Sequence, residues 1–371
     1  MNILSLFDGI SCGMVALERA NIKVDNYFAS EIDKYAIAVS KDNYPNIIQI
    51  GDVTKVSFKD GILYTEYNQH NIGKIDLLIG GFPCQDFSFA GKGLNFEGDR
   101  GKLFFEVVRI LKEVNPTYFL FENVKMKKEY EYYISNLIKV PPVLINSSLV
   151  SAQNRQRLYW TNIKNITQPT DKNITWGDVR EHSVEYEKYY YTEAAMQWLG
   201  RHSNNNNKKL SIHTDSDKMQ MIEASHGKKY SSQRFFGIID IPSKYQAVGS
   251  MRGRYLVNGI RQDAKELTAG NTQQYIEFRY DGKSNALTTV SKDNVVVPFT
   301  HNNRVPASEF FFRYITPLEC EKLQTLPAGY TAKVSDSQRY KMIGNGWTVD
   351  VISHIFRHIN EDMSQYDNSL F

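Results

Sequence analysis

The fold is decided by the stretch NILSLFDGISCGMVALERA at residues 2–20. Its apolar residues 3–7 predict a short buried strand, the glycine-containing residues 8–13 predict a tight turn, and residues 14–20 have helical character. Glycines between a strand and a helix let a ligand approach the backbone, and the N-terminus of the helix faces that ligand. The stretch is therefore typical of a nucleotide-type turn. It lacks the full GxGxxG pattern, so a plain glycine turn is the alternative.

The same alternation of strand and helix continues to about residue 160. Apolar runs predict strands at residues 26–30, 75–79 and 118–121, and helical patterns lie at residues 32–43 and 102–114. Such alternation predicts an α/β fold with a doubly wound, parallel sheet and helices on both of its faces.

The texture of the sequence changes between about residues 165 and 303. Short glycine-bounded segments and an Asn-rich run replace the alternation, and strands are expected at residues 286–290 and 295–299. Helical patterns return at residues 317–326 and 349–359, and we expect the polar tail that follows to be loose. We therefore predict a first domain from residues 1–164 and 304–371, with an inserted domain of loops and strands at residues 165–303.

Composition excludes several classes of protein. The 371 residues carry 44 Lys and Arg against 41 Asp and Glu, a net charge of +3, which excludes a histone-like cationic binder. Three cysteines cannot form a disulfide framework, and this favours a reducing cytosol. We see no apolar run of the roughly 18 residues that a membrane span requires and no signal peptide, so we expect a cytoplasmic protein.

Acidic residues stand at the expected ends of two further strands. Glu31 follows the second strand, where an acid commonly binds ribose hydroxyls, and Asp52 would end the third strand and could reach an adenine amine. Solvated surface acids are the alternative for each residue taken alone. Together with the first turn, they favour a nucleotide-like ligand.

The segment GGFPCQDFS at residues 80–88 follows another predicted strand. Open α/β sheets place their sites at such strand ends, and Pro83 stiffens the backbone on both sides of its ring. A buried structural role is the most frequent one for a lone cysteine. The polar neighbours of Cys84 favour a nucleophile instead.

Two more polar motifs follow strand-like runs. Glu122, in the triplet ENV, could be a surface acid or a general acid whose pKa is raised by partial burial. Arg155 and Arg157, in QNRQR, alternate beside a strand and are expected on one face, with a solvated cationic edge as the alternative.

These motifs, in the order FDG, GGFPCQ, ENV, QxRxR and a late GNG at residues 344–346, resemble the DNA cytosine-5 methyltransferases. The resemblance covers residues 1–163 and 305–364. The segments at 5–9 and 150–152, with Trp347, are similar to the vertebrate de novo branch and its prokaryotic and phage relatives. The resemblance implies a Rossmann-like methyltransferase domain that uses S-adenosylmethionine, with an inserted target recognition domain. Gly346 and Trp347 depart from the commoner pair of small residues.

The resemblance also implies a role for each matching residue. Cys84 would attack C6 of cytosine, Glu122 would act at N3, Arg157 would hold O2, and Arg155 would steady the cysteine loop. A soft, partly ionised thiol suits this addition. The residues expected at the cofactor are Phe7, Asp8, Gly9, Gly13, Glu31, Ile32, Asp52, Val53, Pro83 and Asn345, and Gln85 and Ser88 are expected to contact DNA.

The expected insert contains a basic segment. Residues 228–265 hold eight Lys and Arg against two Asp, an excess of +6, and Arg252 and Arg254 are the best candidates for DNA contacts. A solvated loop face is the alternative. The chemistry requires the cytosine to be flipped out of the duplex.

We therefore expect a monomeric enzyme that methylates C5 of cytosine in a specific double-stranded DNA sequence, in a bacterial or phage-infected cell. A restriction endonuclease would be a partner in function and not in a complex. A transfer RNA methyltransferase, a silent DNA-binding homologue and an oxidoreductase are the alternatives. His354 and His358 lie four residues apart but lack the HExxH pattern, so no metal is expected.

Overall fold

The computed structural model describes residues 1–82, 99–181, 184, 186–189 and 315–368, with the strand segments 246–254, 256–257, 260–261, 273–278, 284–285 and 294–298. Internal contacts divide the chain into two units. The first comprises Met1–Asn146, Gln156–Pro169 and Gly346–Phe371, and the second comprises Ser147–Arg155 and Thr170–Asn345. The boundaries predicted at residues 164 and 303 stay a prediction.

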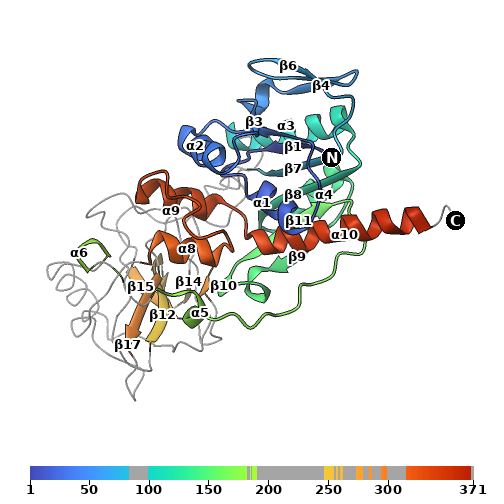
Figure 1. The fold of residues 1–371 in the computed structure, drawn as a ribbon. Coiled ribbons are helices and arrows are strands. Elements are labelled where there is room, and N and C mark those ends of the chain that lie inside the picture. Colours follow the sequence, from blue (N-terminus) through green and yellow to red (C-terminus); the bar gives the residue numbers. More distant parts are fainter. Residues whose placement is uncertain are drawn as a thin grey trace. The chain divides into compact units, whose positions relative to one another are not determined.

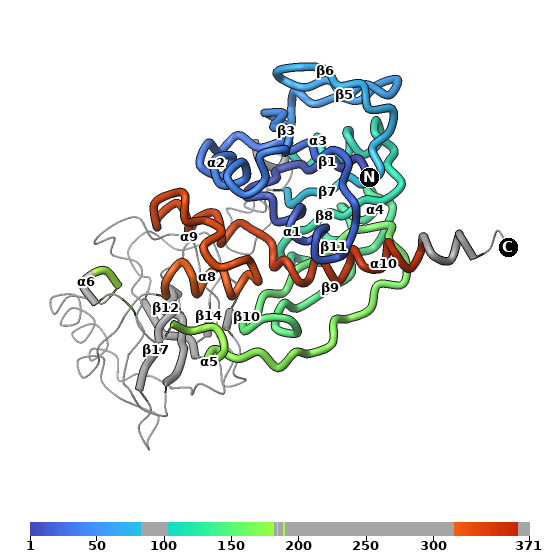
Figure 2. Tube along the Cα trace, in the orientation of Figure 1, coloured from blue at the N-terminus to red at the C-terminus, as the bar shows by residue number. Residues whose placement is uncertain are grey.

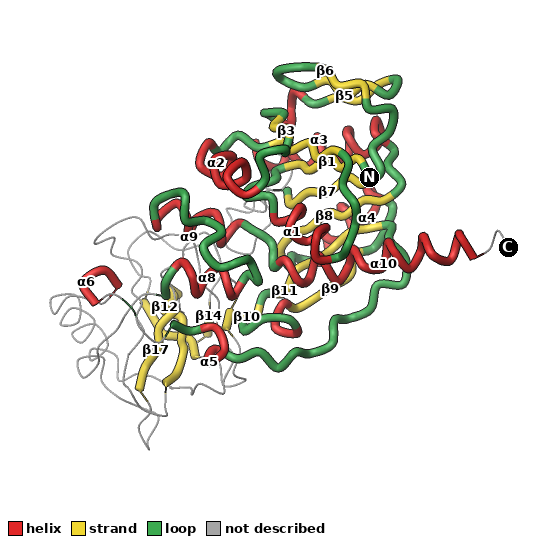
Figure 3. The backbone as a smooth tube through the Cα atoms, viewed as in Figure 1, coloured by secondary structure: helices red, strands yellow, loops and turns green. Residues whose placement is uncertain are grey.

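A seven-stranded sheet forms the centre of the first unit (Figures 1 and 3). Its strands, in spatial order, are β3 (Ile48–Gln49), β2 (Asn26–Ser30), β1 (Asn2–Leu6), β7 (Leu77–Gly81), β8 (Tyr118–Val124), β11 (Gln156–Thr161) and β9 (Pro142–Asn146). The first five run parallel, and β11 is antiparallel to both of its neighbours. The strand order reverses between β1 and β7, and α/β sheets bind ligands at the carboxyl ends of strands beside such a reversal. The predicted α/β class and doubly wound sheet are confirmed.

Helices cover both faces of this sheet. They are α1 (Cys12–Arg19), α2 (Lys34–Asn43), α3 (Asp99–Val114), α4 (Lys128–Ile138) and α10 (Val349–Asn368). Because side chains alternate along a strand, Leu4 of β1 joins a core with Phe104 of α3 and Ile134 of α4. On the other face, Ile79 of β7 lies directly under Gly13 of α1.

The last helix packs on the first one (Figure 2). Arg19 Nη1 and Asp350 Oδ1 lie 2.7 Å apart, and Asn360 Nδ2 donates to the Ala20 carbonyl at 2.8 Å. The expectation of a loose tail is wrong for most of its length, because α10 continues to Asn368. The tail contains no proline or glycine that would end the helix early.

A small antiparallel sheet, which the sequence did not indicate, lies between β3 and β7 along the chain. It contains β4 (Ser57–Lys59), β5 (Ile62–Tyr64) and β6 (Gln69–Asn71), and the 3₁₀ turn η1 (Val53–Lys55) precedes it. Leu63 is fully buried in the core, and the Phe58 N–H donates to Glu113 Oε2 of α3 at 3.0 Å. These contacts fix the small sheet against the core of the first unit and against α3.

The second unit contains short elements. Its described strands are β10 (Gln153–Asn154), β12 (Gln246–Arg254), β13 (Leu256–Val257), β14 (Ile260–Arg261), β15 (Gln273–Phe278), β16 (Ser284–Asn285) and β17 (Asn294–Pro298), and its helices are η3 (Ser147–Leu149), α5 (Trp176–Val179), α6 (Tyr186–Tyr189), α8 (Pro317–Leu323) and α9 (Asp336–Asn345). The strand expected at 295–299 corresponds to β17, and the one expected at 286–290 lies outside the described residues.

Candidate active site

The turn after β1 has an unusual backbone. Phe7, Gly9 and Ser11 all have positive φ values, of 54°, 61° and 59°. Non-glycine residues rarely adopt this conformation, and such strain is concentrated at functional sites. A Cβ atom at Gly9 would meet nothing within 4 Å among the described residues, so the turn borders open space next to the N-terminus of α1. This arrangement fits a ligand that approaches the backbone closely.

Glu31 joins this turn to the end of β2. Its carboxylate accepts from the backbone N–H groups of Gly9, Ile32 and Asp33, each at 2.8 Å. A carboxylate has about four acceptor positions, so one is left for a ligand hydroxyl. The neighbouring Ile32 side chain is 74% exposed, an apolar surface directly beside the fixed carboxylate. The Glu31 carboxylate suits a sugar hydroxyl, and the exposed Ile32 side chain suits a flat ring.

Asp8 is surrounded by hydroxyl groups. Tyr27 Oη donates to one carboxylate oxygen at 2.7 Å and Ser11 Oγ donates to the other at 2.5 Å. Burial raises the pKa of Asp8 to about 6, although hydrogen bonds from Ser11, Ser5 and Tyr27 oppose this shift. Ser11 Oγ also lies 2.6 Å from Ser40 Oγ of α2. The first turn is therefore bonded to β2 through Tyr27 and to α2 through Ser40.

Asp52 lies beyond the end of β3 and caps the turn η1. Its Oδ1 accepts from the Thr54 N–H at 2.9 Å, and its own N–H donates to Glu66 Oε2 at 3.0 Å. Because β2 and β3 are adjacent and parallel, Glu31 and Asp52 follow strands that end at the same edge of the sheet. The predicted cofactor residue Val53 is buried in the core.

The end of β7 meets the end of β8. Gly81 pairs with Glu122 in the sheet, and a Cβ atom at Gly81 would lie 2.8 Å from Trp347 Nε1 and 3.2 Å from Glu122 Oε2. A side chain at position 81 would therefore press on both residues. Trp347, a departure from the common pattern, fills space between Gly13 and Gly81.

Glu122 and Arg157 form a buried ion pair. Glu122 Oε1 lies 2.9 Å from Arg157 Nε, and only about a tenth of each side chain is exposed. Arg157 Nη1 also donates to the Gln156 carbonyl at 2.9 Å. The burial argues against a solvated acid and a solvated cationic edge at these two positions. An acid and a guanidinium fixed together can bind a planar polar group.

The asparagine of the ENV triplet has a structural role that its sequence alone did not indicate. Asn123 is buried and its Nδ2 donates to the Phe82 carbonyl at 3.2 Å. The Phe82 ring packs against Phe104, with ring centroids 5.0 Å apart. The residue that precedes Pro83 is thus fixed from two sides, whereas Pro83, Cys84, Gln85 and Ser88 lie outside the described residues. The presence of Asn123 within the ENV triplet was the only feature of the sequence that could have pointed to this role.

A family model for C-5 cytosine-specific DNA methylases matches residues 1–361. The chain belongs to this family. It is therefore a DNA (cytosine-5) methyltransferase, and the family implies dependence on S-adenosylmethionine.

Individual relatives cover nearly the whole chain. The Type II methyltransferase M1.ScrFI of Lactococcus lactis subsp. cremoris is 28% identical over 95% of this chain and 76% of its own length. The orphan methyltransferase M.SPRI of Bacillus phage SPR is 26% identical over 97% of each chain. The solved structure of the Entamoeba histolytica methyltransferase EhMeth matches 98% of each chain with a TM-score of 0.60 and 16% identity. That structure supports the fold.

Other predicted residues of the methyltransferase lie in the second unit. Arg155 is 3% exposed, and its Nη1 donates to the Gly344 carbonyl at 3.3 Å. Asn345 is the exposed last residue of α9. Arg252 and Arg254 lie two positions apart on β12, whose backbone pairs with β15.

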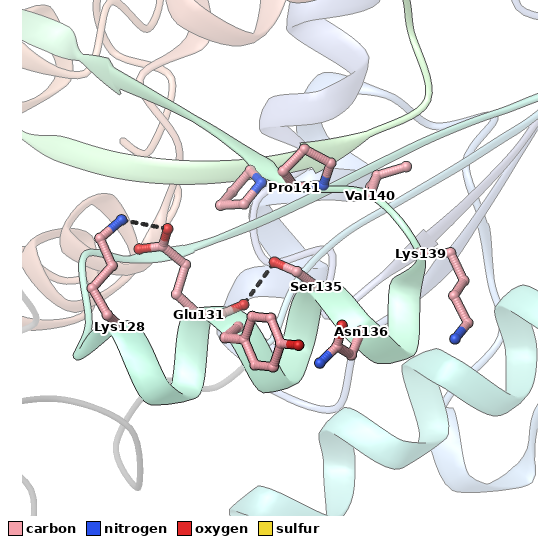
Figure 4. A pocket seen from close by; sticks show the side chains of 9 residues that line it. Lys128, Glu131, Ser135, Asn136, Lys139, Val140 and Pro141 are labelled. Carbon is pink, nitrogen blue, oxygen red and sulfur yellow. Dashed lines mark hydrogen bonds and ion pairs between the residues drawn. The ribbon is translucent and has the colours of Figure 1, made fainter.

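A hollow of about 590 Å³ lies between α4 and the start of β9, but it contains none of the predicted site residues. Its only carboxylate among the lining residues, Glu131, lies 2.7 Å from Lys128 Nζ, and Ser135 Oγ donates to the Glu131 carbonyl at 2.6 Å (Figure 4). Its one acid is thus already paired, and no residue of the hollow belongs to the motifs described above.

The described residues contain no cluster of three or more His, Cys, Asp or Glu side chains that could hold a metal ion. His354 Nε2 lies 2.8 Å from the Thr167 carbonyl, and His358 Nδ1 lies 2.9 Å from Glu361 Oε2. Among the described helices, none combines the length and apolar character needed to cross a membrane.

Proposed function

We propose that this chain methylates C5 of a flipped-out cytosine in a specific double-stranded DNA sequence, through a covalent bond between Cys84 and C6. The observation that carries the proposal is the buried Glu122–Arg157 pair beside Gly81, three residues before Cys84. A buried acid and guanidinium beside the residue that leads into the Pro83–Cys84 motif suit a pyrimidine, which offers a ring nitrogen and a carbonyl oxygen side by side.

The cofactor would lie at the carboxyl ends of β1, β2 and β3. Glu31, fixed by three N–H donors, would accept from the ribose hydroxyls, and Asp52 would accept from the adenine amine. The open space at Gly9 would take the part of the cofactor nearest to the backbone. S-adenosylmethionine, when bound, supplies an electrophilic methyl group.

The protein's own groups would make cytosine reactive. The Cys84 thiolate forms a bond to C6, and the C5=C6 electron pair moves to C5, which becomes the nucleophile. Glu122 would hold a proton at N3 and so draw electrons from the ring, while Arg157 holds O2 and keeps the carboxyl group in place. Once C5 carries the methyl group, its proton leaves to a base, the double bond re-forms and Cys84 is expelled as thiolate. Arg155 would steady the cysteine loop.

The basic segment around Arg252 and Arg254 would supply DNA contacts, with Gln85 and Ser88 near the flipped base. The relatives named above include a Type II enzyme and an orphan phage enzyme. We therefore propose a monomer in the cytoplasm of a bacterial or phage-infected cell, with a restriction endonuclease as a partner in function only.

The test is covalent capture on duplex DNA that contains 5-fluorocytosine at the methylated position. The C5 fluorine cannot leave as a proton does, so the wild type should accumulate a Cys84–DNA adduct that resists denaturing electrophoresis. Cys84→Ser should form no adduct and lose methylation while it still binds DNA. Cys320→Ser, which changes another cysteine, is the matched control and should form the adduct. Methylation by Cys84→Ser, or methylation of transfer RNA in place of duplex DNA, would contradict the proposal.

A further inference from the structure

The Glu66–Tyr67 turn, between β5 and β6, lies directly on the loop that carries Asp52. A Cβ atom at Gly51 would lie 2.2 Å from Glu66 Oε2 and 3.0 Å from Tyr67 Cε2. Gly51 has a φ of 78°, which also favours glycine. The Gly51–Asp52 backbone and this turn are therefore packed with no room for a side chain between them.

The loop that carries Gly51 and Asp52 is fixed by two hydrogen bonds, one from β2 and one to the β5–β6 turn. On one side, Ser30 Oγ at the end of β2 donates to the Gly51 carbonyl at 2.8 Å. On the other side, Glu66 Oε2 accepts the Asp52 N–H at 3.0 Å. With the Asp52 Oδ1 bond to the Thr54 N–H, both the backbone and the carboxylate of Asp52 are oriented.

The turn that presents Glu66 is itself preformed. Thr65 Oγ1 accepts from the Asn68 N–H at 3.0 Å and donates to the Asn68 carbonyl at 2.7 Å, and the Thr65 N–H donates to that same carbonyl at 2.9 Å. The strands on either side are anchored, because Leu63 is buried in the core and the His70 ring packs 5.2 Å from Phe28 of β2. Glu66 is thus carried by a rigid element of the first unit.

We infer that Glu66 is a positioning residue that orients Asp52 for the adenine amine of the cofactor, and that the β5–β6 turn forms the adenine side of the cofactor site. The inference rests on the proposed function. Tyr67 is 65% exposed and its ring lies against Gly51, so an aromatic surface is available next to the residue that precedes Asp52. A carboxylate with an adjacent ring suits a purine that presents an amine, and it disfavours one that presents a carbonyl oxygen.

The test compares two ligands by calorimetry with the full chain: S-adenosylhomocysteine, and S-inosylhomocysteine, in which a carbonyl oxygen replaces the adenine amine. Glu66→Ala should weaken binding of the adenosyl ligand about threefold to tenfold, the range for one hydrogen bond. The inosyl ligand makes no amine contact with Asp52, so its affinity should change much less. A purely structural defect would weaken both ligands equally.

Glu66→Gln keeps an acceptor oxygen for the Asp52 N–H and should preserve wild-type affinity for both ligands. Gln69→Ala, an exposed position on the same hairpin, is the matched control and should also bind like the wild type. Asp52→Ala is the positive control and should abolish the preference for the adenosyl ligand.

Four results would overturn the inference. Glu66→Ala could leave the ratio of the two affinities unchanged while Asp52→Ala lowers it, and this outcome would leave the proposed function intact. Glu66→Gln could be as weak as Glu66→Ala, which would show that the acceptor bond is not what matters. A wild-type chain that binds neither ligand, or an Asp52→Ala variant with an unchanged preference, would remove the cofactor assignment and the inference together.

Discussion

Asp8 carries a proton-dependent contribution to stability at the scale of a single residue. Burial raises its pKa in the folded protein to about 6, against an ordinary value of 3.8. The folded state therefore binds this proton more tightly than the unfolded state does. The contribution is fully favourable below pH 4 and is lost as the pH rises through about 6.

We expect the wild type to lose up to about 3 kcal/mol of stability from this group between pH 4 and pH 7. Asp8→Asn removes the titration, so its stability relative to the wild type should rise over the same interval. Urea unfolding of both proteins at pH 4.5, 6 and 7.5 measures the difference. A difference that does not vary with pH would show that Asp8 has an ordinary pKa.

Single residues also show what sequence can and cannot indicate. Glu31 and Asp52 could be placed at neighbouring strand ends because the apolar runs before them marked the strands. Glu66 could not be assigned, because its contact with Asp52 depends on a hairpin whose position is set by long-range packing. The burial of Asp8 likewise depends on Tyr27 and other residues that are distant in the sequence.

At the scale of elements, the ends of β7 and β8 meet at Gly81 together with Trp347, which lies just before α10. A methyl group there would press on the Trp347 indole and on Glu122. Overpacking of this kind typically costs about 1–3 kcal/mol.

We therefore expect Gly81→Ala to lower the melting temperature and the methylation rate. Phenylalanine at position 347 has a smaller ring and should leave room for the methyl group. Gly81→Ala should therefore lower the melting temperature and the methylation rate less in the Trp347→Phe variant than in the wild type. A double-mutant cycle of melting temperatures and single-turnover rates checks this coupling. Additive effects in the cycle would mean that Trp347 does not restrict position 81.

Elements with a clear apolar period were predictable, and weakly patterned ones were not. The strand at residues 26–30 was expected with the bounds that the structure has. The strands β4, β5 and β6 have three residues each, too few to show an alternation. The polar end of α10 was expected to be loose because its residues lack an apolar face, but it extends a helix that already exists.

At the scale of the whole molecule, we propose different roles for the two units, namely cofactor binding and DNA contact. The residues that we propose for the cofactor lie mainly in the first unit, and the basic segment belongs to the second. The parallel sheet was visible in the sequence because of the strand-helix alternation, and the insert that we infer from the interruption of that alternation stays a prediction. The bases that are recognised could not be predicted, because direct readout depends on the precise geometry of a few side chains and not on a sequence motif.

Replacing both Arg252 and Arg254 by Ala should weaken DNA binding while the affinity for S-adenosylhomocysteine stays unchanged. Each lost phosphate contact should reduce the slope of log affinity against log salt by roughly one unit, whereas a lost guanine contact should relax one base position by about 1–3 kcal/mol. Binding to cognate and scrambled duplexes over a salt series separates these cases. Lys23→Ala/Lys74→Ala removes two exposed charges from the first unit and serves as the control. Unchanged affinity and slope in the arginine variant would place DNA recognition elsewhere.

The packing of α10 on α1 has a consequence for how the enzyme folds during its synthesis. Residues 12–19 leave the ribosome early, but the helix that covers them is made much later, after the second unit. Domains generally fold as they emerge, from the N-terminal end. The first unit is therefore incomplete until residues 349–368 have been made, and a nascent chain that stops before them lacks the helix that packs on α1. We therefore expect methylation only from chains that extend through α10.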